Sequence, residues 1–219
     1  MGNEELDKLD EDINKILNDK NEKYLEEVIS KAVTDEVTLR EILKGLVSKN
    51  ETFRYNCFKT LFQISKNKPS ILYSEWGYFL NLLESNNSYH RMSAIKILSN
   101  LIQVDTEKKF DLILEQYFNH LNDESMIVAR YLTGSAGQIA REKPYLRNKI
   151  IEKLLEIDST HHEEGRKDLI KHDIIQSFSE FFEGINEKDR ILNFVEKQLN
   201  CSSPKTRKAA KEFIKRFSK

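Results

Sequence analysis

The sequence has few of the residues that define disulfide-bonded, metal-binding or membrane proteins. Cys57 and Cys201 are the only cysteines among 219 residues, and their separation gives neither a disulfide framework nor a metal-ligand spacing. The sequence contains no run of about 18 or more apolar residues, the length needed to span a membrane. The amino terminus is acidic from its fourth residue and lacks the pattern of a secretory signal. We therefore expect a cytoplasmic protein without a membrane partner, a metal ion or a cofactor.

Glycine and proline are also scarce, with seven and three residues respectively. Pro69 and Pro144 each follow the end of an expected helix, where proline stops one helix and can start the next. Pro204 follows two serines that can cap a helix. No segment alternates between apolar and polar residues with period two, so we expect no sheet. The composition predicts an all-α protein of helices joined by short turns.

One pattern of residues recurs along the chain and is called the repeat frame below. It begins at Asn50, Asn87, Ser125, Glu163 and Ser203, so its successive steps are 37, 38, 38 and 40 residues. The other positions of the frame lie at offsets of 3, 7, 11 and 14 from each start, on one stripe of a helix. The residues at offsets 7, 11 and 14 are apolar or small in every copy. We expect core packing for the small residues of this stripe, which include Cys57, Ala94 and Ala210.

Amphipathic stretches lie between the copies of the frame, so each repeat contains two helices. The first helices of the pairs are expected at 36–48, 70–84, 107–121, 144–157 and 187–199. A helical period of this length predicts a single right-handed α-solenoid of about five to six antiparallel helix pairs, an armadillo-type superhelix over 1–219. Its five repeats would span 36–66, 70–103, 107–142, 144–183 and 187–218. Residues 1–35, with helices at 4–17 and 21–33, would form the amino-terminal cap.

The start of the second helix in each pair resembles that of HEAT repeats. The resemblance rests on Asn-x-x-Phe-Arg at 50–54, Asn-x-x-His-Arg at 87–91 and Ser-x-x-Thr-Arg at 203–207. It covers about residues 36–219 and is specific for architecture only. In that family the short polar residue and the arginine form ladders along the stack. Because Ala129 and Lys167 replace the arginine, we expect an interrupted ladder at the third repeat and an altered one at the fourth.

Two glycines fall inside the expected helix of the third repeat, Gly134 and Gly137. Each costs about 1 kcal/mol relative to alanine. Either a neighbouring helix approaches closely there, or the glycines form a shallow groove for a partner. The order of residues is not that of a phosphate-binding loop.

The sequence carries no motif of an enzyme. Its histidine-acid cluster spans 161–173, and on a helix beginning near Ser159 no two histidines have the i, i+4 spacing that favours metal binding. A solvated helix start explains this cluster better. HEAT-like di-iron hydroxylases use repeated His-Glu pairs, whereas this chain has one, at 162–163. HEAT-like DNA glycosylases use exposed aromatic residues, whereas Trp76, the only tryptophan, is expected to be buried.

Charge is distributed unevenly between the two ends. Residues 1–36 contain 12 acids and 5 lysines, whereas residues 203–219 contain 7 basic residues and one acid. Solubilising caps and a favourable helix dipole explain this asymmetry. A basic end that binds an acidic ligand or nucleic acid, and head-to-tail self-association, are the functional alternatives.

The leading hypothesis is a non-enzymatic HEAT-repeat scaffold or adaptor that binds a protein or peptide on its concave surface. The alternative is nucleic-acid binding through the basic carboxyl-terminal helix, including the role of a HEAT-like DNA-repair protein. The candidate binding residues are Lys59, Lys96, Arg130, Gly134, Gly137, Gln138, Lys171, Lys208, Lys211 and Lys215.

Overall fold

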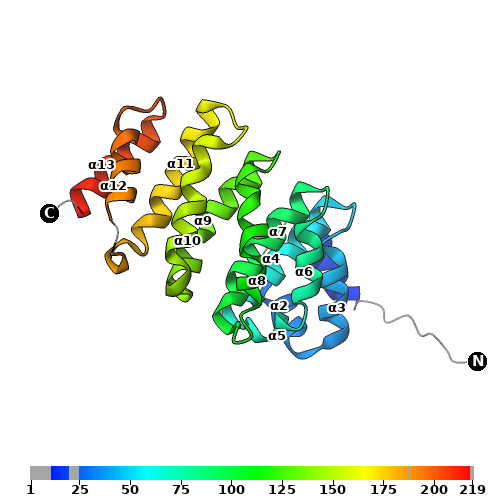
Figure 1. Cartoon of the computed structure of the whole chain (residues 1–219). Coiled ribbons are helices and arrows are strands. Elements are labelled where there is room, and N and C mark those ends of the chain that lie inside the picture. The colour runs from blue at the N-terminus through cyan, green and yellow to red at the C-terminus, as the bar shows by residue number, and fades with distance from the viewer. Residues whose placement is uncertain (1–10, 20–24, 187, 218–219) are drawn as a thin grey trace, which may run out of the picture.

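The computed structural model describes residues 11–19, 25–186 and 188–217, and every regular element in these ranges is a helix. The protein is all-α, as the sequence predicts. Helices follow one another along an elongated body, with the first and last described helices at opposite ends (Figure 1). The described part holds no helix with the length and apolar character needed to cross a membrane. Residues 1–10, 20–24, 187 and 218–219 lie outside the described residues. Parts of three expected helices and five of the twelve amino-terminal acids fall there.

The five copies of the repeat frame form five long helices, called the B row below. They are α4 (Glu51–Asn67), α7 (Ser88–Leu101), α9 (Met126–Glu142), α11 (Glu164–Ser179) and α13 (Pro204–Phe217). Each packs directly against the next one in the row (Figure 1). Cys57, Ala94 and Ala210 are completely buried, which confirms their expected place in the core.

The remaining helices lie before and between those of the B row. They are α1 (Glu11–Asn18), α2 (Leu25–Thr34), α3 (Glu36–Gly45), α5 (Ser70–Tyr73), α6 (Trp76–Leu83), α8 (Lys109–Asn119), α10 (Arg147–Leu155) and α12 (Asp189–Lys197). Within the B-row repeats, α3, α6 and α12 pack against α4, α7 and α13 respectively. The single helix expected at 70–84 is instead two helices, interrupted at Ser74 and Glu75. Trp76 is buried, as expected.

The arginine of the repeat frame has the same local role wherever it occurs. Each guanidinium donates a hydrogen bond to a backbone carbonyl six residues earlier, in the loop before its helix. The pairs are Arg54 with Ser48 (3.0 Å), Arg91 with Ser85 (2.7 Å) and Arg207 with Cys201 (2.7 Å). In the fourth repeat Lys167 reaches the Asp158 carbonyl instead, at 3.0 Å. The third repeat, with alanine at this position, has no equivalent bond.

Buried and partly buried polar side chains connect successive helices of the B row. Each donates across the interface to a carbonyl or side-chain oxygen, so its hydrogen-bonding capacity is satisfied. The bonds run from Asn100 to Ser65 (2.9 Å), from Gln138 to Asn100 (3.1 Å), from Ser177 to the Thr133 carbonyl, and from Thr206 to the Asp168 carbonyl (2.6 Å). Because a shifted helix would leave these groups unpaired, they favour one register between neighbours.

A buried ion pair joins the first turn of α7 to the loop before α9. Arg91 donates to both carboxylate oxygens of Asp123 at 2.7 Å, and the two side chains are 12% and 4% exposed. Burial alone would raise the pKa of Asp123. Hydrogen bonds from the His120 ring, from Arg91 and from the Ser125 backbone N–H outweigh it and hold this pKa well below its ordinary value of 3.8.

This pair predicts a pH-dependent contribution to stability. Because the folded-state pKa of Asp123 is depressed, its contribution is complete above about pH 4 and is lost as the pH falls through the folded value. We expect Asp123→Asn to lower the free energy of unfolding by roughly 3 kcal/mol at pH 7, and by much less near pH 2. Urea unfolding at several pH values measures the difference. Glu107→Gln, at an exposed pair, is the control, and an Asp123→Asn effect that stayed equal at every pH would contradict this account.

Candidate protein-interaction surface

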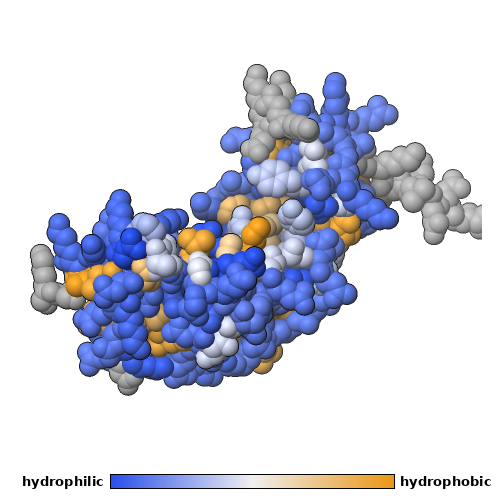
Figure 2. All heavy atoms as spheres, turned by 90° about the horizontal axis from the view of Figure 1, so that it is seen from above, coloured by the Kyte–Doolittle hydropathy of each residue, from blue (hydrophilic) through white to orange (hydrophobic). Residues whose placement is uncertain are grey.

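Exposed apolar side chains lie on three consecutive helices of the B row. They are Tyr55 on α4, Tyr89 on α7, and Ile127 and Tyr131 on α9, with exposed fractions between 38% and 56%. Together they are called the Tyr-Ile surface. The guanidinium of Arg54 lies 4.8 Å from the Tyr89 ring centre, which places this ring beside α4. Viewed from above, the body is bent, and pale and orange spheres gather on the inner side of the bend (Figure 2).

A pocket of about 480 Å³ adjoins this surface where α7, α9 and α11 meet. It is called the Gly134 pocket, and its lining residues are Lys96, Ile127, Arg130, Tyr131, Gly134 and Asp173. Three of the residues proposed from the sequence, Lys96, Arg130 and Gly134, therefore come together here. Sequence reasoning missed the apolar members. The sequence feature that could have identified them is their position. They are apolar residues that lie off the core stripe of the helix, where polar residues are expected.

The two cations of the Gly134 pocket have different partners. Arg130 pairs with Asp173 at 2.6 and 3.1 Å, and these hydrogen bonds raise the pKa of Arg130. Among the described residues, the Nζ atom of Lys96 donates to the Ser135 hydroxyl, at 3.4 Å, and lies over the Phe62 ring, 5.4 Å from its centre. Burial, and then the nearby charge of Lys66, lower the pKa of Lys96. No carboxylate among the described residues forms an ion pair with Lys96, so its charge is not compensated.

The two glycines of α9 differ in their surroundings. A methyl group on Gly134 would meet no atom within 4 Å, so no close packing requires glycine there. A methyl group on Gly137 would lie 2.7 Å from Cδ of Glu180, whose carboxylate pairs with Arg141. The atoms that approach Gly137 therefore belong to the end of one side chain, Glu180. Gly134 instead forms part of an open pocket.

Two other candidate residues are engaged in contacts within the fold. Lys171 is 7% exposed and pairs with Asp158 at 2.6 Å. Gln138 donates to the Ser99 carbonyl and to Asn100 across the α7–α9 interface. Both therefore lie outside the candidate surface. Lys208, Lys211 and Lys215 are exposed on α13, at the far end of the row.

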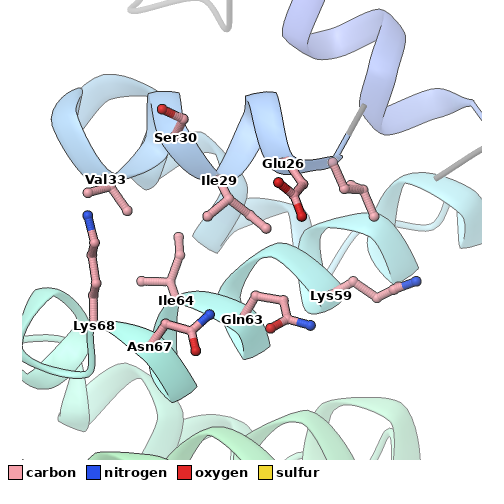
Figure 3. Close-up of a pocket in the computed structure, with 10 residues that line it drawn as sticks. Glu26, Ile29, Ser30, Val33, Lys59, Gln63, Ile64, Asn67 and Lys68 are labelled. Carbon is pink, nitrogen blue, oxygen red and sulfur yellow. The ribbon is translucent and has the colours of Figure 1, made fainter. Parts of the chain in front are cut away.

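Lys59 lines a second pocket, between α2 and α4. This pocket has a volume of about 530 Å³ (Figure 3). Ile29 of α2 and Ile64 of α4 point toward one another across it, and Glu26, Lys59 and Lys68 lie around its margin. The pocket combines an apolar floor with charges of both signs. It is a groove between two packed helices and shares no lining residue with the Gly134 pocket.

The histidine-rich segment does not begin a helix near Ser159. A 3-10 turn ends there, and α11 starts at Glu164. His162 is 4% exposed and its Nε2 lies 3.0 Å from the Leu121 carbonyl, so this residue is buried rather than solvated. His161 Nδ1 lies 2.6 Å from the Asn122 side-chain oxygen. Within the described ranges, no group of three His, Cys, Asp or Glu side chains could hold a metal ion.

Comparison with known proteins identifies no family. No family model matches the chain, and neither does any curated protein. Among solved structures, the chain is similar to the crystal structure of an engineered protein, with 12% sequence identity and a TM-score of 0.47 over 94% of this chain and 96% of the other. Similarity at this level supports no conclusion about family or function.

The two glycines of α9 are predicted to respond differently to an added methyl group. We expect Gly134→Ala to raise the free energy of unfolding by about 1 kcal/mol, because alanine favours the helix and the added methyl meets open space. Gly137→Ala should show no such gain, because Glu180 must move away from its position. Chemical denaturation measures both. Gly77→Ala, at another uncrowded helical glycine, is the positive control, and a destabilised Gly134→Ala would show that glycine is structurally required there.

Proposed function

We propose that the chain is a HEAT-like α-solenoid, a stack of antiparallel helix pairs, and that it acts as a non-enzymatic protein-binding scaffold. Two features support the solenoid. The helices of the B row pack in chain order, and three copies of the frame use the same arginine to hold the preceding loop. Repeats that contact only their neighbours build extended surfaces, which such proteins use for binding.

The observation that carries the binding function is the Tyr-Ile surface beside the Gly134 pocket. Isolated exposed apolar residues need no explanation, but a group of them on consecutive helices next to a pocket is typical of an interaction site. Tyrosine is enriched in such sites because its ring supplies a large contact area and its hydroxyl stays solvated. The surface lies on the B row, which the solenoid proposal assigns to the concave side.

This function predicts that partner binding depends on the Tyr-Ile surface. We expect the triple variant Tyr89→Ser, Ile127→Ser and Tyr131→Ser to retain at least tenfold less of each specific partner, because buried aromatic and aliphatic anchors dominate such interfaces. The measurement is affinity capture from the source cell's extract by immobilised wild-type and variant chains, with quantitative mass spectrometry.

The control variant changes two exposed apolar residues away from this surface, Val47→Ser and Leu112→Ser. It should retain the same proteins as the wild type. Thermal unfolding of all three proteins checks that the substitutions leave the fold intact. Equal retention by wild type and triple variant would contradict the proposed surface.

Nucleic-acid binding through α13 is the second candidate function. Lys205, Lys208, Lys211, Lys215 and Arg216 are all exposed on this helix. Among its described residues the one ion pair joins Lys208 and Glu212 at 3.9 Å, so most of its positive charge faces solvent. Such a helix can contact successive phosphates of a nucleic-acid backbone.

A salt titration tests this second function. If α13 binds the nucleic-acid backbone, the affinity for a labelled DNA or RNA duplex of about 20 base pairs falls steeply as the salt concentration rises. Charge reversal at Lys208, Lys211 and Lys215 then abolishes binding. Fluorescence anisotropy measures both effects. Lys66→Glu, an exposed lysine on α4, is the matched control. Binding that survives the triple reversal, or no binding at low salt, removes this alternative.

A further inference from the structure

The Gly134 pocket has a charge that the described chain does not neutralise. Its two cations approach from neighbouring helices. Asp173 pairs with Arg130 and contacts the His172 ring at 2.9 Å, and it forms no ion pair with Lys96. Lys96 is partly buried beside the Phe62 ring, with one long hydrogen bond to a neutral hydroxyl. A lysine in such surroundings loses hydration without gaining an ion pair. An anion bound beside Lys96 would restore that interaction.

The rest of the pocket limits the chemistry of this anion. Asp173 accepts from Nε and Nη2 of Arg130 and offsets its charge, so Arg130 attracts a phosphate less strongly than an unpaired guanidinium would. The Asp173 carboxylate also lines the pocket and would repel a doubly charged group more strongly than a singly charged one. Lys96 offers a single point charge with three donors. These features favour a ligand with a single carboxylate over one with a phosphate group.

The apolar part of the occupant follows from the spacing along α9. Ile127, Tyr131 and Gly134 stand at positions i, i+4 and i+7 and therefore share one helix face. The first two are exposed, and the third has open space above its Cα. A large apolar side chain can therefore lie over Gly134, flanked by Ile127 and Tyr131. Lys96 of α7 lines the same pocket.

We propose that the Gly134 pocket binds an acidic segment of a partner protein, in which a carboxylate lies within about one helical turn of a large apolar side chain. The carboxylate pairs with Lys96, and the apolar side chain packs over Gly134. This inference rests on the proposed function, because it requires that the Tyr-Ile surface receives a protein partner. It adds the chemical class of the segment and the residue that recognises its charge.

Selection from a display library of random 16-residue peptides, with the full chain as bait, tests the inference. Enriched peptides should combine Asp or Glu with Leu, Ile, Met, Phe or Trp. An enriched peptide is then synthesised, together with a copy in which its acid is replaced by the corresponding amide. We expect the amide copy to bind at least tenfold more weakly, and Lys96→Gln to lose the same factor for the acidic peptide.

A double-mutant cycle isolates the proposed contact. Against Lys96→Gln, the acidic and amide peptides should bind almost equally, because the residue that distinguishes them is gone. Lys149→Gln, at an exposed lysine on α10, is the matched control and should keep the full preference for the acidic peptide. If Lys96→Gln fails to fold, the affinities of the acidic and amide peptides for the wild-type chain still test the inference.

The outcomes separate this inference from the function on which it rests. Failure to select any peptide, or peptides whose binding is unchanged by Ile127→Ser, overturns the proposed surface itself. Peptides that depend on Ile127 but show no acidic preference, or are insensitive to Lys96→Gln, overturn the carboxylate inference alone. Tighter binding of a phosphoserine peptide than of its glutamate counterpart would also overturn the carboxylate inference.

Discussion

Side-by-side packing of the B-row helices is the constraint on which the rest of the structure depends. An inner helix such as α9 is held on both flanks, by α7 and by α11, while its core stripe is buried. Large side chains fit poorly between closely spaced helices, which explains the buried alanine and serine positions along this row. One narrow stripe of each helix remains exposed, so binding residues on the row must come from that stripe.

Polar contacts across the row specify how the helices align. Apolar packing tolerates small shifts, whereas a buried amide or hydroxyl loses its partner when a helix slides. Asn100 and Gln138 illustrate this role, because each reaches across to the preceding helix. The ion pair of Arg91 and Asp123 adds a similar constraint at the loops between repeats. Together these contacts hold neighbouring stripes in fixed positions, which a binding surface shared by several helices requires.

Features that depend on local sequence could be predicted, and features that depend on neighbouring helices could not. The burial of Cys57 follows from helical periodicity alone. The cap at Ser203, whose hydroxyl accepts from the Thr206 backbone N–H, follows from the local sequence before Pro204. The difference between Gly134 and Gly137 follows from Glu180, whose position depends on how α11 packs against α9. Lys171 was similarly proposed as a surface residue because its partner Asp158 lies in a turn that helical periodicity does not reveal.

Three locally unfavourable choices coincide at the Gly134 pocket. Glycine replaces a better helix former, at a cost of about 1 kcal/mol, without a crowding neighbour. Ile127 is 55% exposed where a polar residue would serve the fold equally well. Lys96 is partly buried, and no carboxylate among the described residues forms an ion pair with it. Each has an unremarkable explanation alone, but all three line one pocket. Because departures from local preference concentrate at functional sites, their coincidence favours a common cause, and a ligand that covers glycine and isoleucine while pairing with lysine accounts for all three.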